Sequence, residues 1–293
     1  MLKMTKIKII IIALFLIANA IWIYMYISSS GASRTLRADT MAQIGQTLSD
    51  SGITVTADTF PVIPSSMPLY NATNELSDKQ SIANMVLGSD NYMLEPDHFQ
   101  TKTQDLVVDG GRLDFLPVIL DADTTNLLVT PQSFWAKLKV KSAMKSAGLW
   151  TSKSAILSTE NASDSKQLIA TVSDKLDGYD VVDSYAKIWV GREKTKDITD
   201  TTIVTKISGF NWLDTTYTKI PNSDVQLMSL TDILTKYAQG HDKTQPLTIT
   251  AVDFGYLVGE RAPDVVTKQV DIGLKITTDQ GVAYISAIPN STQ

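Results

Sequence analysis

Residues 9–27 have the sequence IIIIALFLIANAIWIYMYI, which contains no charged side chain and one strongly polar side chain, Asn19. At about 1.5 Å per residue, a helix of this length is ~28 Å long, close to the hydrocarbon thickness of a bilayer. The sequence therefore predicts one transmembrane helix over residues 9–27. The direction of this helix decides on which side of the membrane the rest of the chain lies.

The charges on either side of this segment predict its direction. Lys3, Lys6 and Lys8 precede it, whereas a polar Ser/Gly segment follows it. The positive-inside rule then makes residues 1–8 a cytoplasmic tail and residues 28–35 a spacer on the outer side. The expected location is the cell membrane, with a single pass and an extracytoplasmic body.

A cleavable signal peptide is the alternative interpretation of the same segment. Residues 30–32 (SGA) are small enough for a signal peptidase, although the apolar part of a signal peptide is usually shorter than residues 9–27. Both interpretations place the body outside the cytoplasm.

Side chains within the predicted span indicate contacts with lipid and with another helix. Asn19 is costly in hydrocarbon unless it finds a partner, and an interhelical hydrogen bond of this kind contributes ~0.6–2 kcal/mol. Bonding of Asn19 to its own helix backbone is the alternative. Small alanines allow close helix packing, and aromatic rings near the outer end favour the headgroup layer. The candidate residues for the membrane interface and helix packing are Ala13, Ala18, Asn19, Ala20, Trp22, Tyr24 and Tyr26.

The composition indicates a folded body and argues against several classes of function. The chain has 293 residues, 43% of them hydrophobic and 19% charged, which is typical of a globular protein. Its net charge of -5 argues against a nucleic-acid partner. The chain contains no cysteine, which excludes disulfides, thiolate nucleophiles and thiolate metal ligands.

The body is predicted to be α+β, with a first domain over residues 36–130 and a second over residues 131–293. Strands follow strands instead of alternating with helices, which argues against a doubly wound fold. The expected helices run from Leu36 to just before Gly52, from a capping box at Ser77 to Gly88, over Gln132–Ala147 after Pro131, and from a capping box at Ser229 to Gly240. The expected strands are 53–57, 106–108, 113–115, 155–159, 181–190, 203–207, 247–258, 270–276 and 282–288.

No catalytic, cofactor-binding or metal-ligating residue can be nominated from the sequence. His98 and His241 are far apart in sequence, there is no Gly-x-Ser-x-Gly motif, and both histidines are expected at the surface. Asp121 and Asp123 lack the remainder of a calcium loop. The carboxylates at positions 90, 95 and 97 do not identify a glycosidase pair. We expect a protein that is not an enzyme and has no cofactor, with an envelope hydrolase as a remote alternative.

Several segments together resemble a known family. They are the residues IANMVLG at 82–88, GRLDF at 111–115, VDFGY at 252–256 and YISA at 284–287, in this order after a Lys-flanked anchor. This arrangement resembles the YycI/YycH-type extracytoplasmic regulators of the cell-wall two-component system in low-GC Gram-positive bacteria.

The resemblance implies a fold and a role. The fold would be two PepSY-like units, each a helix packed on a small antiparallel sheet. The role would be that of a non-enzymatic accessory protein that modulates a membrane sensor histidine kinase through its transmembrane helix and extracytoplasmic domains. The expected partners are that kinase, a paralogous single-span regulator and the lipid bilayer. A tethered module that binds a peptide or cell-wall fragment between its domains is the alternative function.

Overall fold

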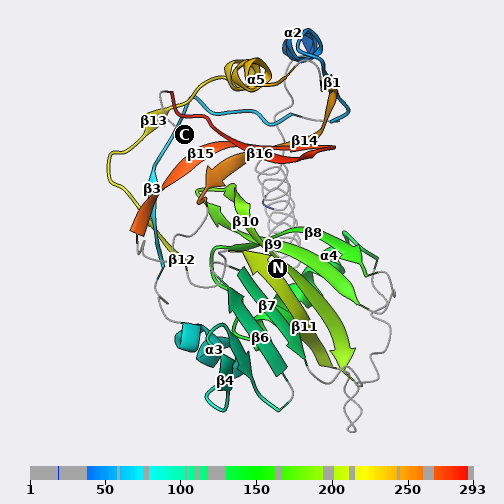
Figure 1. Cartoon of the computed structure of the whole chain (residues 1–293), viewed down its shortest axis with the longest axis vertical. Coiled ribbons are helices and arrows are strands. Elements are labelled where there is room, and N and C mark those ends of the chain that lie inside the picture. Colours follow the sequence, from blue (N-terminus) through cyan, green and yellow to red (C-terminus); the bar gives the residue numbers. More distant parts are fainter. Residues whose placement is uncertain are drawn as a thin grey trace, which may run out of the picture.

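The computed structural model (Figure 1) describes most of the body and one residue of the predicted span. The described residues are 19, 38–57, 60–74, 79–102, 104–109, 112–117, 130–162, 167–193, 201–210, 215–242, 245–259 and 267–289.

Four helices have described bounds, and two of them lie on each half of the molecule. The helices α2 and α5 lie together on one half of the molecule, whereas α3 and α4 belong to the other half (Figure 1). The helices are α2 (Ala38–Ser49), α3 (Lys79–Leu87), α4 (Phe134–Ser146) and α5 (Leu230–Gln239).

The half with α3 and α4 contains an antiparallel sheet with the strand order β4-β5-β6-β7-β11-β10-β9-β8. A helix followed by four consecutive strands occurs twice, and the two sets of strands join where Ile207 of β11 faces Phe115 of β7. The strands are β4 (Tyr92–Glu95), β5 (His98–Gln100), β6 (Gln104–Asp109), β7 (Arg112–Pro117), β8 (Ser154–Asn161), β9 (Leu168–Leu176), β10 (Tyr179–Glu193) and β11 (Thr201–Phe210).

One face of this sheet is apolar and is covered by the two helices. Alternate side chains of each strand point to this face, because the side-chain period of a strand is two. The buried residues form what we call the α3/α4 core, which includes Ile82 and Leu87 of α3, Ala136 and Val140 of α4, and Phe99, Leu106, Phe115, Ile188 and Ile207 of the strands.

The half with α2 and α5 is built around the long hairpin of β14 and β15. The strand β1 pairs with β14 in parallel, whereas β3 and β16 pair with different parts of β15, and β12 pairs with β3. The strands are β1 (Ile53–Val55), β2 (Ser66–Met67), β3 (Tyr70–Asn74), β12 (Thr215–Lys219), β13 (Val225–Gln226), β14 (Leu247–Leu257), β15 (Thr267–Thr278) and β16 (Gly281–Ser286).

The helices α2 and α5 bury their apolar faces on this hairpin. The α2/α5 core contains Ile44 and Leu48 of α2, Ile233 and Leu234 of α5, and Ile249, Tyr256, Ile272, Leu274 and Ile276 of the hairpin. Residues from both ends of the described chain therefore meet in one core.

The strand β10 belongs to both halves. Its early residue Val181 is buried in the α2/α5 core and pairs in parallel with Tyr256 of β14. Its later residues Ile188 and Val190 are buried in the α3/α4 core. The pairing of β9 with β10 is irregular between Asp180 and Tyr185, and this irregularity lets β10 turn from one sheet partner to the next.

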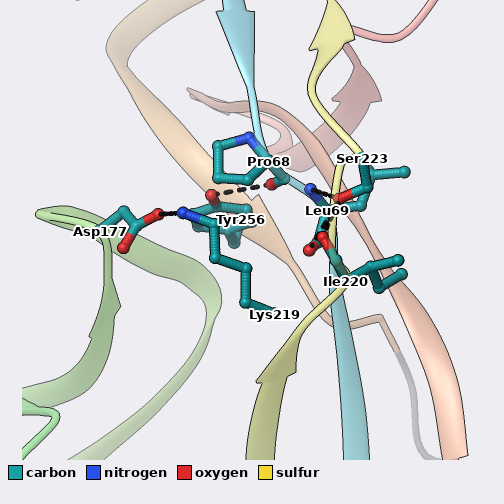
Figure 2. A network of polar contacts seen from close by, with 7 residues as sticks. All are labelled: Pro68, Leu69, Asp177, Lys219, Ile220, Ser223 and Tyr256. Atoms are coloured by element: carbon teal, nitrogen blue, oxygen red, sulfur yellow. Dashed lines mark hydrogen bonds and ion pairs between the residues drawn. The ribbon is translucent and has the colours of Figure 1, made fainter.

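Polar contacts hold the same junction (Figure 2). The Tyr256 hydroxyl donates to the carbonyl oxygen of Pro68 at 3.1 Å, and Lys219 Nζ donates to Asp177 Oδ2 at 2.7 Å. Asp177 lies in the turn between β9 and β10, so this ion pair links that turn to β12. The Ser223 hydroxyl accepts from the Leu69 amide at 3.0 Å, which holds the chain beside β3.

The predicted α+β fold of two PepSY-like units, each a helix on a small antiparallel sheet, is wrong, because the described chain is mostly strand with short helices. Fourteen strands are hydrogen-bonded into one large mixed sheet, and β10 connects the two halves. The sequence pattern located most strands, but periodicity does not reveal a strand's partner. The 15-residue length of β10 lets it reach both halves of this sheet.

Most predicted local elements are confirmed. The Ser229 cap and the hairpin of β6 and β7 are present, and Gly52, Gly88 and Gly148 have positive φ after their helices. The start of α4 differs, because Ser133 and not Pro131 precedes its first turn and accepts from the Ala136 amide at 3.1 Å. The strands that were not predicted are β2, β3, β4, β5, β9, β12 and β13.

The predicted span falls almost wholly outside the described residues, as do residues 1–8 and 28–35. Asn19 has helical backbone and is exposed. No helix in the described part of the chain is both long enough and apolar enough to cross a bilayer. The domain boundary expected at residues 130 and 131 stays a prediction, because it follows the undescribed segment 118–129.

Candidate functional site

Exposed apolar side chains gather on β4 and on α4. Tyr92, Met93 and Leu94 are consecutive on β4 and are 50%, 59% and 50% exposed. Tyr92 faces Gln100 and Met93 faces Phe99, so their side chains leave opposite faces of β4 and make this edge of the sheet apolar on both sides. Exposed apolar side chains that gather in one place mark interaction surfaces, whereas isolated ones are common everywhere. We therefore take the hairpin of β4 and β5 as the candidate functional site and call these three residues the hairpin patch.

The hairpin is anchored to the α3/α4 core. Phe99 of β5 is only 1% exposed and packs in that core. In the turn before it, the Asp97 carbonyl oxygen accepts from the Val108 amide at 2.8 Å. The Asp97 side chain forms an ion pair with Lys79 of α3. The hairpin patch is therefore attached to a hairpin that the α3/α4 core and α3 hold in place.

The connection from α3 to β4 is fixed by a second set of contacts. Gly88 ends α3 with a φ of 82°, a conformation that costs glycine little. The Asn91 side-chain amide donates to Asn84 Oδ1 at 2.8 Å, and Gln80 donates to Asn91 Oδ1 at 2.9 Å. These bonds set the direction in which β4 leaves the helix, so a partner would meet a preorganised surface.

The strand β4 is the last strand in the order of the sheet, and it is irregular. Met93 faces Phe99 and Glu95 faces His98, so Leu94 is an extra residue without a facing partner on β5. A bulge at a sheet edge hinders indiscriminate pairing with other strands. The patch consequently offers its side chains for contact more than its backbone.

Carboxylates surround the hairpin patch. Asp90 lies two residues before β4 and Glu95 ends it, and both are exposed, whereas Asp97 in the next turn is paired with Lys79. These are the carboxylates that the sequence could not assign to a glycosidase. In the structure Asp90 and Glu95 give the apolar patch an acidic rim, which favours a partner that carries basic residues beside apolar ones.

The outward face of the hairpin carries a polar row. The Tyr92 hydroxyl donates to Gln100 Oε1 at 2.9 Å, and His98 Nε2 contacts Asp105 Oδ1. His98 is half-buried beside this carboxylate. The other histidine of the chain, His241, is far from the hairpin in sequence, and its Nε2 atom contacts the Gln245 carbonyl oxygen at 2.8 Å. Among the described residues, no three His, Asp or Glu side chains converge as metal ligands would.

The remaining residues named from the sequence contribute no described site. Asp121 and Asp123 lie outside the described residues, as do all the candidate span residues except Asn19. The predicted membrane and helix contacts of Ala13, Ala18, Ala20, Trp22, Tyr24 and Tyr26 therefore stay predictions.

Buried carboxylates lie instead at the junction of the two halves. Asp174 of β9 is 5% exposed, and burial raises its pKa to about 6, against a lowering by Lys153. Its Oδ1 atom is buried without a hydrogen-bond partner. Burial also raises the pKa of Asp183, although this carboxylate accepts from the amides of Val258 and Gly259. Asp183 ties β10 to the end of β14, whereas Asp174 is a buried group of β9 that makes no such bond.

The exposed residues of β4 and α4 were not predicted as functional. Tyr92, Met93 and Leu94 form a short apolar run, which sequence alone cannot distinguish from a buried strand. A weak signal existed in α4, because its apolar residues do not form one stripe. Phe134 and Trp135 are the residues that fall outside the buried stripe.

Comparison of the sequence with protein-family models and with curated proteins found no match.

Proposed function

We propose that this chain is a non-enzymatic docking protein of the cell membrane, which binds an extracytoplasmic segment of a membrane sensor protein on the hairpin patch. The observation that carries the proposal is the exposure of Tyr92, Met93 and Leu94 on a braced hairpin with an acidic rim. Tyr and Met are enriched at the centres of protein interfaces, and charged residues are depleted there.

The chemistry of the patch restricts its partner. Three apolar side chains supply the area that is removed from water on binding, and the carboxylates of Asp90 and Glu95 favour basic residues in the bound segment. Because Asn91 and Phe99 already hold the hairpin in place, little ordering is required when the partner binds.

The sequence supplies the membrane part of this proposal. The apolar residues 9–27 and the lysines before them favour a single anchor with the body outside. The resemblance to the YycI/YycH-type regulators supports a sensor histidine kinase of a cell-wall two-component system as the partner. Asn19 then adds a contact between transmembrane helices.

Capture of a peptide or wall fragment between the two halves is less favoured. The turn of β9 and β10 occupies the place where the halves meet, and Leu176, Tyr179 and Val181 beside it pack in the α2/α5 core. A ligand between the halves would need a cavity there, whereas docking on the exposed hairpin needs none.

Site-specific crosslinking in intact cells tests the proposal. A photoreactive phenylalanine analogue replaces Met93 in one variant and Leu157 in a control, because Leu157 is an exposed apolar residue on β8 at the other end of the same eight-strand row. We expect Met93 to trap a membrane sensor protein and Leu157 to trap none. A membrane fraction without any specific adduct at Met93 would contradict the proposal, as would recovery of the chain dissolved in the cytoplasm.

A charge-changing variant separates docking from folding. Met93→Lys adds a positive charge to the exposed patch and removes apolar contact area without touching the core. We expect it to weaken the adduct and to alter target-gene expression, whereas Leu157→Lys leaves both unchanged. Equal effects of the two substitutions would indicate a general loss of protein.

A further inference from the structure

The helix α4 has an outer face that the docking proposal does not use. Phe134, Trp135 and Leu138 are 71%, 66% and 45% exposed, although they belong to a well-packed helix. The opposite face is fully buried, since Ala136, Val140, Ala143 and Met144 are at most 1% exposed. The exposed aromatic residues therefore do not contribute to the core.

Lysines surround these apolar residues. The sequence of α4 is FWAKLKVKSAMKS, which contains four lysines and no acidic residue, on a chain with a net charge of -5. Lys141 and Lys145 continue the stripe of Phe134 and Leu138, because positions three or four apart share one helix face. Lys137 flanks it and is also exposed.

The aromatic residues are held rigidly at the start of the helix. The Ser133 hydroxyl accepts from the Ala136 amide at 3.1 Å, and the Gln132 amide donates to the Thr159 hydroxyl at 2.8 Å. The rings of Phe134 and Trp135 meet edge to face, with centroids 5.6 Å apart. The outer face is thus a fixed apolar surface and not a flexible end.

We propose that the outer face of α4 rests on the surface of an anionic lipid bilayer. Tryptophan and phenylalanine favour the headgroup boundary, and lysines beside them are attracted to acidic headgroups. A protein partner fits less well, because lysine is depleted at protein interfaces. The charge of this face is opposite to that of the hairpin patch, so the two surfaces select different partners.

The absence of cysteine from the chain allows a direct test. A single Leu138→Cys substitution in the full chain is labelled with an environment-sensitive fluorophore, and a Val282→Cys control is labelled on β16. Vesicles of phosphatidylcholine, with or without phosphatidylglycerol, carry a quencher on their acyl chains. The signal reports only the depth of the labelled residue, whatever else attaches the chain to the bilayer.

With phosphatidylglycerol present, we expect a blue-shifted emission at residue 138 and quenching of about twofold or more, because interfacial helices sink into the headgroup boundary. The label at residue 282 stays unquenched. Reversal of Lys137, Lys141 and Lys145 to Glu should reduce the quenching at residue 138 to the level seen without phosphatidylglycerol, since each lysine contributes to attraction by an acidic surface. The same reversal at the exposed Lys102, Lys187 and Lys236 is the matched control.

Three results would overturn the inference. The first is equal quenching with and without phosphatidylglycerol. The second is unchanged quenching in a Phe134→Ser, Trp135→Ser variant that still binds soluble polyphosphate, which would reduce the face to a site for any polyanion. The third is crosslinking of two Leu138→Cys chains to each other, which would assign the face to a second copy. Each of these outcomes leaves the docking proposal for the hairpin patch intact.

Discussion

Val181 of β10 is the parallel partner of Tyr256 of β14, and this pairing joins the two halves of the sheet. It sits where β10 departs from β9, and the Ser173 hydroxyl lies 2.6 Å from the carbonyl oxygens of Val181 and Ser184 on the departing strand. The buried hydroxyl has one proton, which it donates between the two main-chain acceptors that the interrupted pairing leaves open. The junction is therefore a built feature of the fold.

Gly255 allows the close approach of the two strands at this junction. A Cβ atom at this position would overlap the carbonyl oxygen of Asp180. We expect Gly255→Ala to lower the free energy of unfolding by about 2–4 kcal/mol, measured by chemical denaturation. Gly45→Ala is the control, because Gly45 lies within α2 with open space around it and should gain about 0.5–1 kcal/mol. Equal effects at both sites would contradict this account.

Asp174 predicts a dependence of stability on pH. Its folded-state pKa is raised to about 6, so the protonated form is favoured on folding. This contribution is fully present below about pH 4 and is lost as the pH rises through about 6. Asp174→Asn should flatten that part of the profile and raise the free energy of unfolding at pH 7.5 by up to about 3 kcal/mol. An unchanged profile would show that other groups, such as Asp183, cause it.

The hydroxyl of Tyr256 should matter more than the nearby ion pair. Tyr256→Phe removes the bond to the Pro68 carbonyl oxygen from a side chain that is 0% exposed, which should cost about 1 kcal/mol. Lys219 and Asp177 are about half exposed, so Lys219→Met should cost less than about 0.5 kcal/mol. Thermal unfolding of the two variants provides the comparison, and the reverse order would refute it.

The cap of α5 should contribute measurably to stability. The Ser229 hydroxyl accepts from the Asp232 amide at 3.2 Å and donates to Asp232 Oδ2 at 2.6 Å. Ser229→Ala should therefore lower the free energy of unfolding by about 1 kcal/mol. Ser142→Ala on the exposed face of α4 should have no such cost, and denaturant titrations of both variants would detect the difference.

Local elements were predictable where the deciding residues are neighbours in sequence. The hairpin of β6 and β7 was expected from two apolar runs separated by the sequence Asp109-Gly110-Gly111, and α5 from Ser229 and its apolar stripe. The strand β9 was missed because buried Ser173 and Asp174 interrupt its apolar pattern. Those polar residues serve the junction, which sequence periodicity does not describe.

The sheet as a whole was not predictable from local patterns. Thr73 of β3 faces Thr267 of β15, and their hydroxyls are 3.0 Å apart although the residues are separated by 194 positions. Nothing in either segment identifies the other. The candidate site was missed for a related reason, because exposure of Met93 depends on β4 being the last strand of the sheet.

The shared strand β10 has a mechanical consequence. No linker separates the halves at Val181, so a force on the α3/α4 half travels along a continuous hydrogen-bonded backbone into the α2/α5 half. A tilt of the α3/α4 half would therefore be transmitted to the α2/α5 half. Cleavage between residues 181 and 185 would remove the strand that both cores share.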